Sequence, residues 1–204
     1  MEAKKDGKKI IIIFGHHSPD HWVDSYSSPI MNWSAQINFL EDCIKLSNNL
    51  DNCYIILRYK YLDWLDNIYF KDILKKISNC KNIKISNYYE NFYAYKLCAN
   101  ADLVIAKHTS IADECLSEGI PVLFHEYTHN SQKLVLDFSN YLPPELICYN
   151  FEELLEKSKS LLFNNSSQLK NKIIELNQTI YYVNNKRNIK NKIIKQLENL
   201  ISEN

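Results

Sequence analysis

The sequence lacks three features that would each point to a broad class of protein. It carries no net charge, with 24 basic and 24 acidic residues among 204, so it has no overall positive field of the kind that attracts nucleic acid. It has no CxxC pair, and it has no apolar run long enough to span a membrane. These absences argue against a nucleic-acid-binding protein that works by general electrostatics and against a transmembrane protein.

The cysteines and the start of the chain indicate a cytoplasmic location. Six cysteines are scattered along the chain, several of them within predicted core elements, as expected of reduced thiols: Cys43, Cys53, Cys80, Cys98, Cys115 and Cys148. The charged start MEAKKDGKK leads into five apolar residues only, which are too few for a signal peptide. We therefore expect a cytoplasmic protein.

The length and the hydrophobic content set the number of domains. With 204 residues and 46% hydrophobic composition, the chain can bury one α/β core, and two full Rossmann-like domains would not fit. We predict a single Rossmann-like domain over residues 1–165, with three α/β/α layers and a mostly parallel sheet of about six strands. Residues 166–204 are predicted to form a helical C-terminal tail that packs on the same domain.

Apolar periodicity locates the predicted elements. We predict strands at residues 9–14, 54–57, 82–86, 103–105, 122–124 and 146–148, and helices at 35–48, 67–78, 87–101, 110–118 and 150–165. In the first helix, Ser34 is the expected N-cap, and Ile37, Leu40 and Ile44 form the expected inner stripe, which could also include Cys43. The short apolar runs fit strands that are buried on both faces of a parallel sheet.

The stretch ADLVIAKHTSIADECLSEGIPVLFHE, residues 101–126, carries most of the functional information. It predicts a strand, a polar turn, a short helix that stops at Gly119, and a second strand. A helix that begins directly after a strand presents free N–H groups at the carboxyl edge of the sheet, where open α/β sheets bind ligands. Thr109 and Ser110 could bind a phosphate there, and Glu114 one turn further on could accept sugar hydroxyls. Alternatively, Ser110 is a simple N-cap that forms a partial capping box with Asp113, and Glu114 is a solvated early-helix acid favoured by the helix dipole.

Residues 101–124 resemble the nucleotide-sugar-binding signature in the C-terminal domain of GT-B glycosyltransferases, particularly the bacterial capsule, surface-polysaccharide and teichoic-acid-type transferases. That family places Ser or Thr at the donor phosphates and Glu on the nucleotide ribose. The resemblance therefore assigns Thr109 and Ser110 to phosphate, with His108 beside them, and Glu114 to ribose. It covers roughly residues 8–165, and nucleotide-sugar 2-epimerases share the same architecture.

Further donor-binding candidates follow two other predicted strands. Arg58 and Lys60 come directly after the second strand, where they could neutralise a diphosphate or remain solvated surface charges. The resembling transferases often carry a basic residue at this point, although the Pro and His of their usual turn are absent here. Glu126 and His125 follow the fifth strand and are secondary candidates for contact with the sugar or the phosphates.

The loop after the first strand is rich in histidine. His16, His17, Asp20 and His21 invite a metal interpretation, but the sequence offers no second ligand cluster at a diagnostic spacing. We predict no metal and no cofactor other than the nucleotide-sugar substrate. His16 and His17 are instead the candidate catalytic residues, because a histidine near the phosphates could orient or protonate a leaving oxygen.

Two further regions each allow two interpretations. The aromatic residues of the predicted helix over 87–101 could stack a nucleobase, but core and rim packing is the favoured role: Tyr88, Tyr89, Phe92, Tyr93 and Tyr95. In the tail, seven cations face one acid across residues 168–195. This basic amphipathic segment could contact the inner face of a membrane or a partner domain, or it could be the solvated outer face of a packed helix.

The predicted function is that of a glycosyltransferase donor domain for surface-polysaccharide or glycoconjugate synthesis. A complete GT-B enzyme also has an acceptor domain of similar size, which this chain does not contain, so transfer would need a further domain or a separate acceptor subunit. The alternatives are a non-catalytic sugar-nucleotide-binding or assembly module and an epimerase-like enzyme that acts on the nucleotide sugar itself.

Overall fold

The computed structural model describes eight stretches of the chain. They are residues 7–15, 33–60, 62–86, 90, 92–106, 109–126, 142–164 and 167–179. All statements about the structure below concern these residues.

Six parallel strands form one sheet in the order β3-β2-β1-β4-β5-β6. The strands are β1 (Lys9–Phe14), β2 (Cys53–Arg58), β3 (Ile83–Ser86), β4 (Leu103–Ala106), β5 (Val122–His125) and β6 (Ile147–Cys148). The register sets Ser86, Arg58, Phe14 and Ala106 side by side in one row. The carboxyl ends of the strands therefore meet along one edge, and the predicted Rossmann-like sheet is confirmed.

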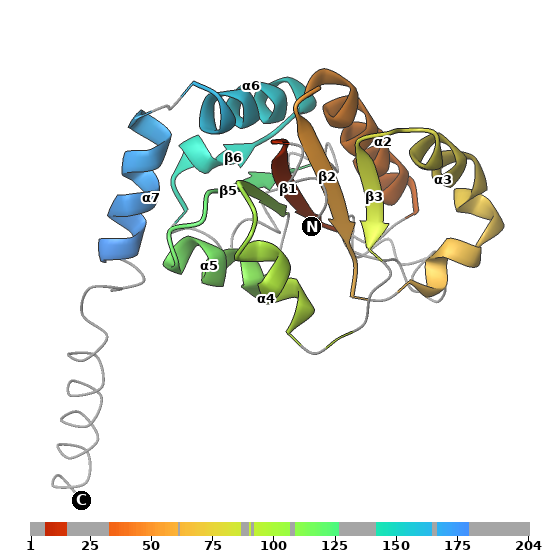
Figure 1. The fold of residues 1–204 in the computed structure, drawn as a ribbon, viewed down its shortest axis with the longest axis horizontal. Coiled ribbons are helices and arrows are strands. Elements are labelled where there is room, and N and C mark those ends of the chain that lie inside the picture. The colour runs from red at the N-terminus through yellow and green to blue at the C-terminus, as the bar shows by residue number, and fades with distance from the viewer. Residues whose placement is uncertain are drawn as a thin grey trace, which may run out of the picture.

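Helices cover both faces of the sheet (Figure 1). They are α2 (Trp33–Asn49), α3 (Lys71–Ser78), α4 (Tyr93–Cys98), α5 (Ser110–Ser117), α6 (Phe151–Leu162) and α7 (Ser167–Thr179). Helices α2, α3 and α6 lie on one face, while α4 and α5 lie on the other. Helix α7 contacts α5 beyond the β6 side of the sheet.

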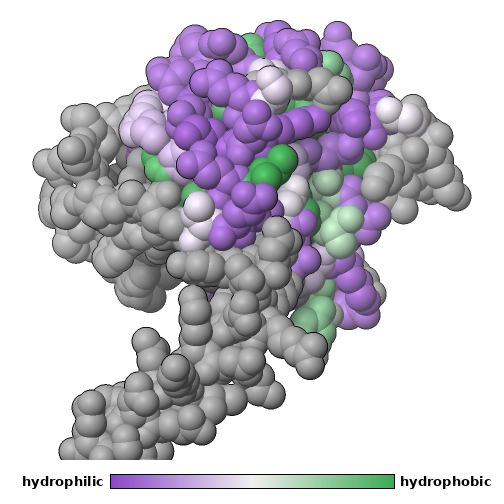
Figure 2. Space-filling view, turned by 90° about the vertical axis from the view of Figure 1, so that its left-hand side faces the viewer, coloured by the Kyte–Doolittle hydropathy of each residue, from purple (hydrophilic) through white to green (hydrophobic). Residues whose placement is uncertain are grey.

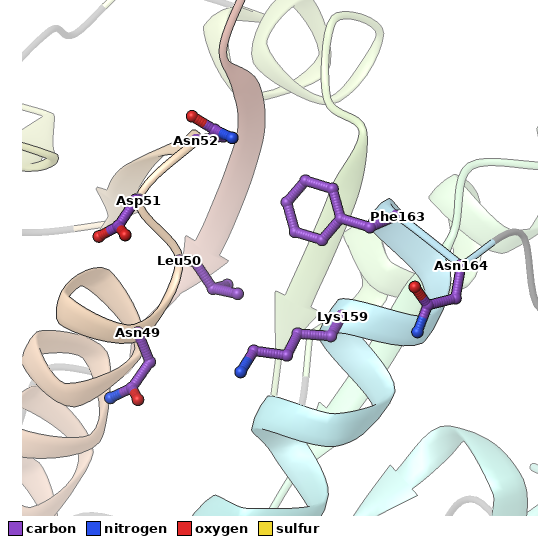
Figure 3. Close-up of a pocket in the computed structure, with 7 residues that line it drawn as sticks. All are labelled: Asn49, Leu50, Asp51, Asn52, Lys159, Phe163 and Asn164. Carbon is purple, nitrogen blue, oxygen red and sulfur yellow. The ribbon is translucent and has the colours of Figure 1, made fainter.

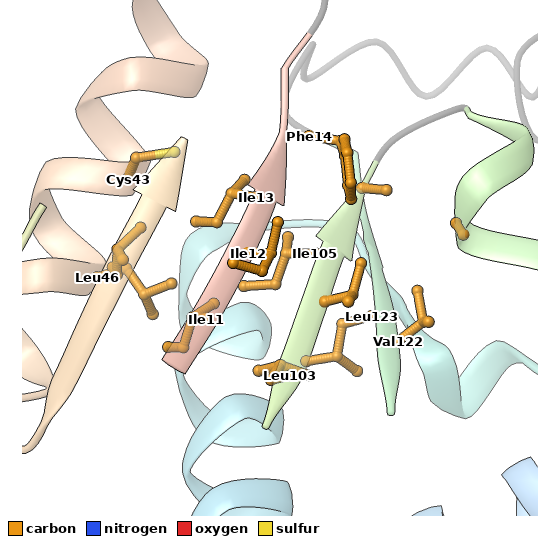
Figure 4. Close-up of a cluster of buried hydrophobic side chains, with 14 of the residues drawn as sticks. Ile11, Ile12, Ile13, Phe14, Cys43, Leu46, Leu103, Ile105, Val122 and Leu123 are labelled. Atoms are coloured by element: carbon orange, nitrogen blue, oxygen red, sulfur yellow. The ribbon is translucent and has the colours of Figure 1, made fainter. Parts of the chain in front are cut away.

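The core lies between the central strands and the helices (Figure 4). Residues Ile10 to Ile13 of β1 are 0% exposed, because this strand is covered on both faces and flanked by β2 and β4. On α2 the buried stripe is Phe39, Leu40, Cys43 and Leu46, whereas Ile37 and Ile44 are only partly buried. The expected inner stripe of this helix was therefore shifted by part of a turn.

Helix α5 is capped differently at its two ends. Gly119, at φ 76°, donates its N–H to the Leu116 carbonyl at 3.0 Å, and Ile120 donates to the Cys115 carbonyl at 2.9 Å. These two bonds form a Schellman motif, so the predicted glycine stop is confirmed. At the other end Thr109, not Ser110, is the N-cap, and its side chain makes no capping hydrogen bond. The simple capping role considered for Ser110 is thus wrong.

Several predicted boundaries differ from the structure. The region expected to be helical from residue 67 begins with a 3₁₀ turn at Ile68–Phe70, and α3 starts only at Lys71; another 3₁₀ turn, Asp63–Asp66, precedes this region. Among the described residues of the helix expected over 87–101, only α4 is helical, and Leu146 belongs to a 3₁₀ turn rather than to β6. Helix α2 already includes Trp33, so Ser34 lies within its first turn and is not its N-cap.

The described part of the basic tail, residues 167–179, is packed on the domain. Helix α7 buries Leu169, Ile173 and Leu176, and Lys172 pairs with Glu175 at 3.0 Å on its outer side. Figure 2 shows the side of the molecule on which α7 lies, and this surface is largely hydrophilic where it is coloured. Within the described stretches, none of the helices is both long and apolar enough to cross a membrane.

Candidate functional site

The candidate site lies where the order of the strands reverses. From β1 the chain builds outward to β2 and β3, and it then returns to the other side of β1 to place β4, β5 and β6. Ligands of open α/β sheets bind at such a switch point, beyond the carboxyl ends of the strands. Here the switch point lies between the ends of β1 and β4, with Gly15 on one side and Thr109 on the other.

Gly15 permits a close approach of Tyr59 at this edge. A Cβ atom on Gly15 would lie 2.2 Å from Cζ of the Tyr59 ring, which no side chain could accommodate without a shift. The Tyr59 hydroxyl in turn accepts a hydrogen bond from Nε2 of Gln36 at 3.0 Å, and its ring contacts Trp64. The end of β1 is thereby joined to the end of β2 and to α2.

Thr109 and Ser110 form the start of α5 at the switch point, as predicted. Thr109 is partly exposed in an extended conformation, and Ser110 is exposed as the first residue of the helix. The first turn of a helix has N–H groups without intrahelical acceptors and carries the positive end of the helix dipole. Because the Thr109 hydroxyl is not used for capping, this turn has the chemistry of an anion-binding site.

Glu114 is exposed one turn further along α5. Its carboxylate accepts a hydrogen bond from the Tyr95 hydroxyl on α4. This bond and the negative charge of Glu114 raise the pKa of Tyr95 above its usual value, because both disfavour the phenolate. The sequence interpretation missed Tyr95 as a partner of Glu114, since 19 residues separate the two positions.

Arg58 lies on the same face of the sheet as Glu114. Its guanidinium carbon lies 5.9 Å from the centroid of the Tyr93 ring of α4. Arg58 and Ala106 are two strands apart, about 10 Å between Cα atoms at normal strand spacing, so contact with a ligand at α5 needs the length of the arginine side chain. Lys60 is exposed two residues beyond the strand end.

Helix α4 contacts two candidate site residues, Arg58 and Glu114, that come from different elements. Tyr93 contacts Arg58, and Tyr95 contacts Glu114. Tyr93 also packs against the core, but Phe92 is 74% exposed and Tyr95 is 47% exposed, with ring centroids 6.1 Å apart. Of the described aromatics, Tyr93 therefore packs on the core, whereas Phe92 and Tyr95 are exposed at its rim; Tyr88 and Tyr89 lie outside the described residues.

The structure does not place every predicted site residue. His16 and His17, the candidate catalytic residues, and His108, a candidate for donor binding, lie outside the described residues. Within the part of the chain that the structure describes, no group of three or more His, Cys, Asp or Glu side chains is arranged to hold a metal ion.

His125, the last residue of β5, and Glu126, the next residue, are enclosed rather than open. Glu126 is 7% exposed, and its N–H donates to the Cys148 carbonyl at 2.8 Å. Nε2 of His125 lies 2.9 Å from the Asp42 carboxylate of α2, and both side chains are almost fully buried. His125 therefore points beneath α2 and away from α5, and its expected role as a residue facing the sugar or phosphates is not supported.

Asp42 is a further polar residue that the sequence interpretation missed. Burial alone would raise the pKa of Asp42, but the hydrogen bond and charge of His125, together with Lys45 at 3.2 Å, outweigh it and lower the pKa. The one available signal was its position, because Asp42 lies three residues after Phe39 and four before Leu46 on the buried side of α2.

A cavity of about 300 Å³ lies at the opposite edge of the sheet (Figure 3). It is lined by the turn at residues 49–52, which precedes β2, and by the end of α6 with the two residues after it. Leu50 and Phe163 point into this space, whereas the Asp51 carboxylate points away from it. Because the turn leads into the amino end of β2, the cavity is separate from the candidate site.

Sequence comparison identifies no relative, since no family model matches the chain and no curated protein is detectably similar in sequence. Structural comparison does find similar folds. The C-terminal domain of a Francisella tularensis glycosyl transferase group 1 family protein, LpcC, is 12% identical with a TM-score of 0.54, over 88% of this chain and 91% of that one.

Larger proteins contain the same fold as one part of their length. An O-GlcNAc transferase mutant from Thermobaculum terrenum matches 85% of this chain with 32% of its own, at 12% identity and a TM-score of 0.56. A UDP-GlcNAc 2-epimerase from Neisseria meningitidis, solved with UDP-GlcNAc, matches 81% of this chain with 38% of its own, at 13% identity and a TM-score of 0.53. The chain thus spans about a third of the length of these two proteins. Its fold is the Rossmann-like fold of one domain of GT-B glycosyltransferases and nucleotide-sugar epimerases.

Proposed function

We propose that this chain is the donor-binding domain of a GT-B glycosyltransferase and binds a nucleotide sugar at the carboxyl edge of its sheet. The observation that carries the proposal is the position of α5. This helix starts at the topological switch point and presents Thr109 and Ser110 there, with Glu114 exposed one turn further on. A phosphate at the helix start and ribose hydroxyls at Glu114 would use both features.

The proposed role of the donor-binding residues follows from the negative charge of the leaving group. Departure of the nucleoside diphosphate leaves negative charge on its phosphate oxygens, and donors that are already in place stabilise that charge most effectively. Thr109, Ser110 and Arg58 supply such donors from the same face of the sheet, and Lys60 adds a cation at the same edge. His16 or His17 would orient or protonate the leaving oxygen, and no metal ion takes part in the proposed reaction.

Transfer would also need an acceptor site. The larger proteins with this fold devote about two thirds of their length to other parts, so we propose that a second domain or a separate subunit binds the acceptor. The acceptor would be a precursor of a surface polysaccharide or glycoconjugate, made on the cytoplasmic side of a membrane. Residues 186–195 contain five of the tail's seven cations and would supply any peripheral membrane contact.

Calorimetric titration with a panel of uridine, guanosine, adenosine and cytidine sugar nucleotides tests donor binding. We expect one nucleotide class to bind, and we expect Glu114→Gln to weaken binding roughly tenfold, since one hydrogen bond to a charged group is lost. Glu118→Gln is the matched control, because Glu118 is exposed on the same helix but one turn further from its start. The proposal fails if no sugar nucleotide binds or if both variants bind as the parent does.

Two alternatives belong to different functional classes. The shared fold of the UDP-GlcNAc 2-epimerases favours an epimerase-like reaction as the second candidate, and product analysis with donor alone would reveal it. A non-catalytic binding or assembly module would bind the donor and give no product with or without a partner domain. In the proposed transferase, His16→Ala and His17→Ala should reduce turnover in the complete assembly more than donor affinity.

A further inference from the structure

The cavity at the amino edge of the sheet takes no part in the proposed function. It has a volume of about 300 Å³ and lies between the turn that follows α2 and the end of α6 (Figure 3). Thr109, Ser110 and Arg58 lie at the carboxyl ends of the strands instead. Small-molecule sites have volumes of about 300–1,000 Å³, so this cavity has room for a ligand of about one or two rings.

Two apolar side chains face the cavity from different elements. Leu50 points into it from the turn after α2, and Phe163 points into it from the end of α6. Leu50 is 2% exposed, whereas Phe163 is 46% exposed. A flat ligand that lies on Phe163 would bury the exposed part of its ring, and paired aromatic rings attract each other beyond the effect of burial. The apolar part of the lining therefore fits an aromatic group.

Lys159 supplies a positive charge to the cavity. Its side chain extends from the last turn of α6 toward residues 49–52, whereas the Asp51 carboxylate points away. Within the described part of the chain, the Lys159 ammonium has no hydrogen-bond acceptor and no ion-pair partner. Lys157 on the same helix, in contrast, donates to the Ile147 carbonyl at 2.6 Å. The charge of Lys159 is therefore available to an anionic group of a ligand.

The other groups around the cavity favour a ligand with a single negative charge. Helices α2 and α6 both end there, so their last carbonyl groups place partial negative charges beside it. One lysine can balance one negative charge of a ligand against these helix ends, but not two. The remaining side chains of the rim are neutral amides, which can donate or accept hydrogen bonds: Asn49, Asn52 and Asn164. A carboxylate therefore fits better than a phosphate.

We propose that this cavity is a further ligand-binding site, for a small aromatic carboxylate. The ring lies on Phe163 and Leu50, and the carboxylate pairs with Lys159. The site does not depend on the proposed function, because the two sites lie at opposite edges of the sheet, and we expect both to be occupied at once. For a ligand of about ten to fifteen non-hydrogen atoms, we expect a Kd of about 1 mM or tighter.

NMR titration of the isotope-labelled full-length chain with naphthoate tests this proposal. We expect saturable shifts of the side-chain amide signals that line the cavity, those of Asn49, Asn52 and Asn164. Naphthamide has the same rings without the charge, and naphthyl phosphate carries more negative charge near neutral pH. Both should bind at least several-fold more weakly than naphthoate.

Two variants locate the bound ligand. Lys159→Gln should weaken naphthoate binding roughly fivefold, because it removes the charge but keeps a polar side chain. Phe163→Leu should weaken it roughly threefold, because it removes the aromatic partner. Both side chains are exposed, so both variants should keep the Tm of the parent. Lys75→Gln is the matched control, since Lys75 is an exposed lysine in the last turn of α3 and does not line the cavity.

Three outcomes would overturn the proposal. Naphthoate could leave the cavity signals unshifted, the amide or the phosphate could bind as tightly as the carboxylate, or Lys159→Gln could bind like the parent. Titration with the sugar-nucleotide panel, with and without naphthoate, separates this site from the proposed function. If naphthoate binds at the cavity and no sugar nucleotide binds, the proposed function fails and the carboxylate site stands.

Discussion

Two carboxylates of this protein, Asp42 and Glu114, lie on opposite faces of the same sheet and have opposite surroundings. Asp42 lies on the buried side of α2. Nε2 of His125 lies 2.9 Å from its carboxylate, and Nζ of Lys45 lies 3.2 Å from it. Glu114 is exposed on α5 and shares one hydrogen bond with an exposed tyrosine. A buried ion pair belongs to the stability of the fold, whereas an exposed acid with one weak partner is available to a ligand.

The largest expected effect on stability comes from breaking the buried Asp42–His125 pair. Asp42→Asn should lower the free energy of unfolding by about 2–3 kcal/mol, because it removes a buried charge-assisted hydrogen bond. Urea unfolding at neutral pH measures this loss, and a double-mutant cycle with His125→Gln separates the pair from its surroundings. Glu175→Gln, in the exposed pair with Lys172, should leave the unfolding midpoint unchanged. Equal midpoints for Asp42→Asn and the parent would contradict the contrast between the two acids.

The next effect concerns the cation on the open face. Arg58→Gln should reduce nucleotide-sugar affinity roughly tenfold or more, because it removes a charged hydrogen-bond donor from the phosphates. Arg58→Lys should recover part of this loss, since the charge returns without the planar fork. Calorimetry at two salt concentrations measures both variants. If Arg58→Gln binds like the parent, the guanidinium is only a surface charge that rests on Tyr93.

The pH dependence should also separate the two acids. The lowered pKa of Asp42 means that its pair stabilises the fold above the unfolded-state pKa, about 3.9, and that this stability is lost as pH falls through the lower folded-state value. Thermal unfolding followed between pH 5 and pH 2.5 should show a steeper loss for the parent than for Asp42→Asn. Parallel curves for the two proteins would mean that another group controls acid unfolding.

The smallest expected effect lies at the exposed contact. Tyr95→Phe should leave Tm unchanged and leave nucleotide-sugar affinity equal or slightly higher, because it frees the Glu114 carboxylate. Glu114→Gln should bring the raised pKa of Tyr95 back toward its ordinary value, as read from ultraviolet titration of the phenolate with Tyr95→Phe as the reference. An unchanged tyrosine titration would show that the contact is absent in solution.

The strands were predictable because a buried parallel strand needs a continuous apolar run. Lys9–Phe14 and Val122–His125 show this pattern, and both appear within one residue of their expected limits. The helix stop at Gly119 was equally accessible, since glycine adopts the left-handed conformation without steric cost. The place of Thr109 and Ser110 could be inferred in the same way, because a helix that follows a buried parallel strand begins at the carboxyl edge of the sheet.

The contacts between distant parts of the chain were not predictable from local pattern. Asp42 and His125 are separated by 83 positions, and their pairing depends on how α2 packs across the end of β5. The start of α4 was not predicted correctly either. The aromatic run before Tyr93 has an apolar period that suits a longer helix, but Phe92 adopts a left-handed conformation. Tertiary packing decided both cases, and no short window of sequence contains that information.

The C-terminal cap of α5 gives this helix a further property. The Schellman motif at Gly119 fixes the end of the helix, so the helix cannot lengthen toward β5. Glu114 is therefore held about 6 Å along the axis from Ser110, at the usual rise per residue. The helix therefore sets a fixed distance between its N-terminal N–H groups and the Glu114 carboxylate. A ligand whose anionic and hydroxyl groups are spaced differently could bind one of these two groups but not both.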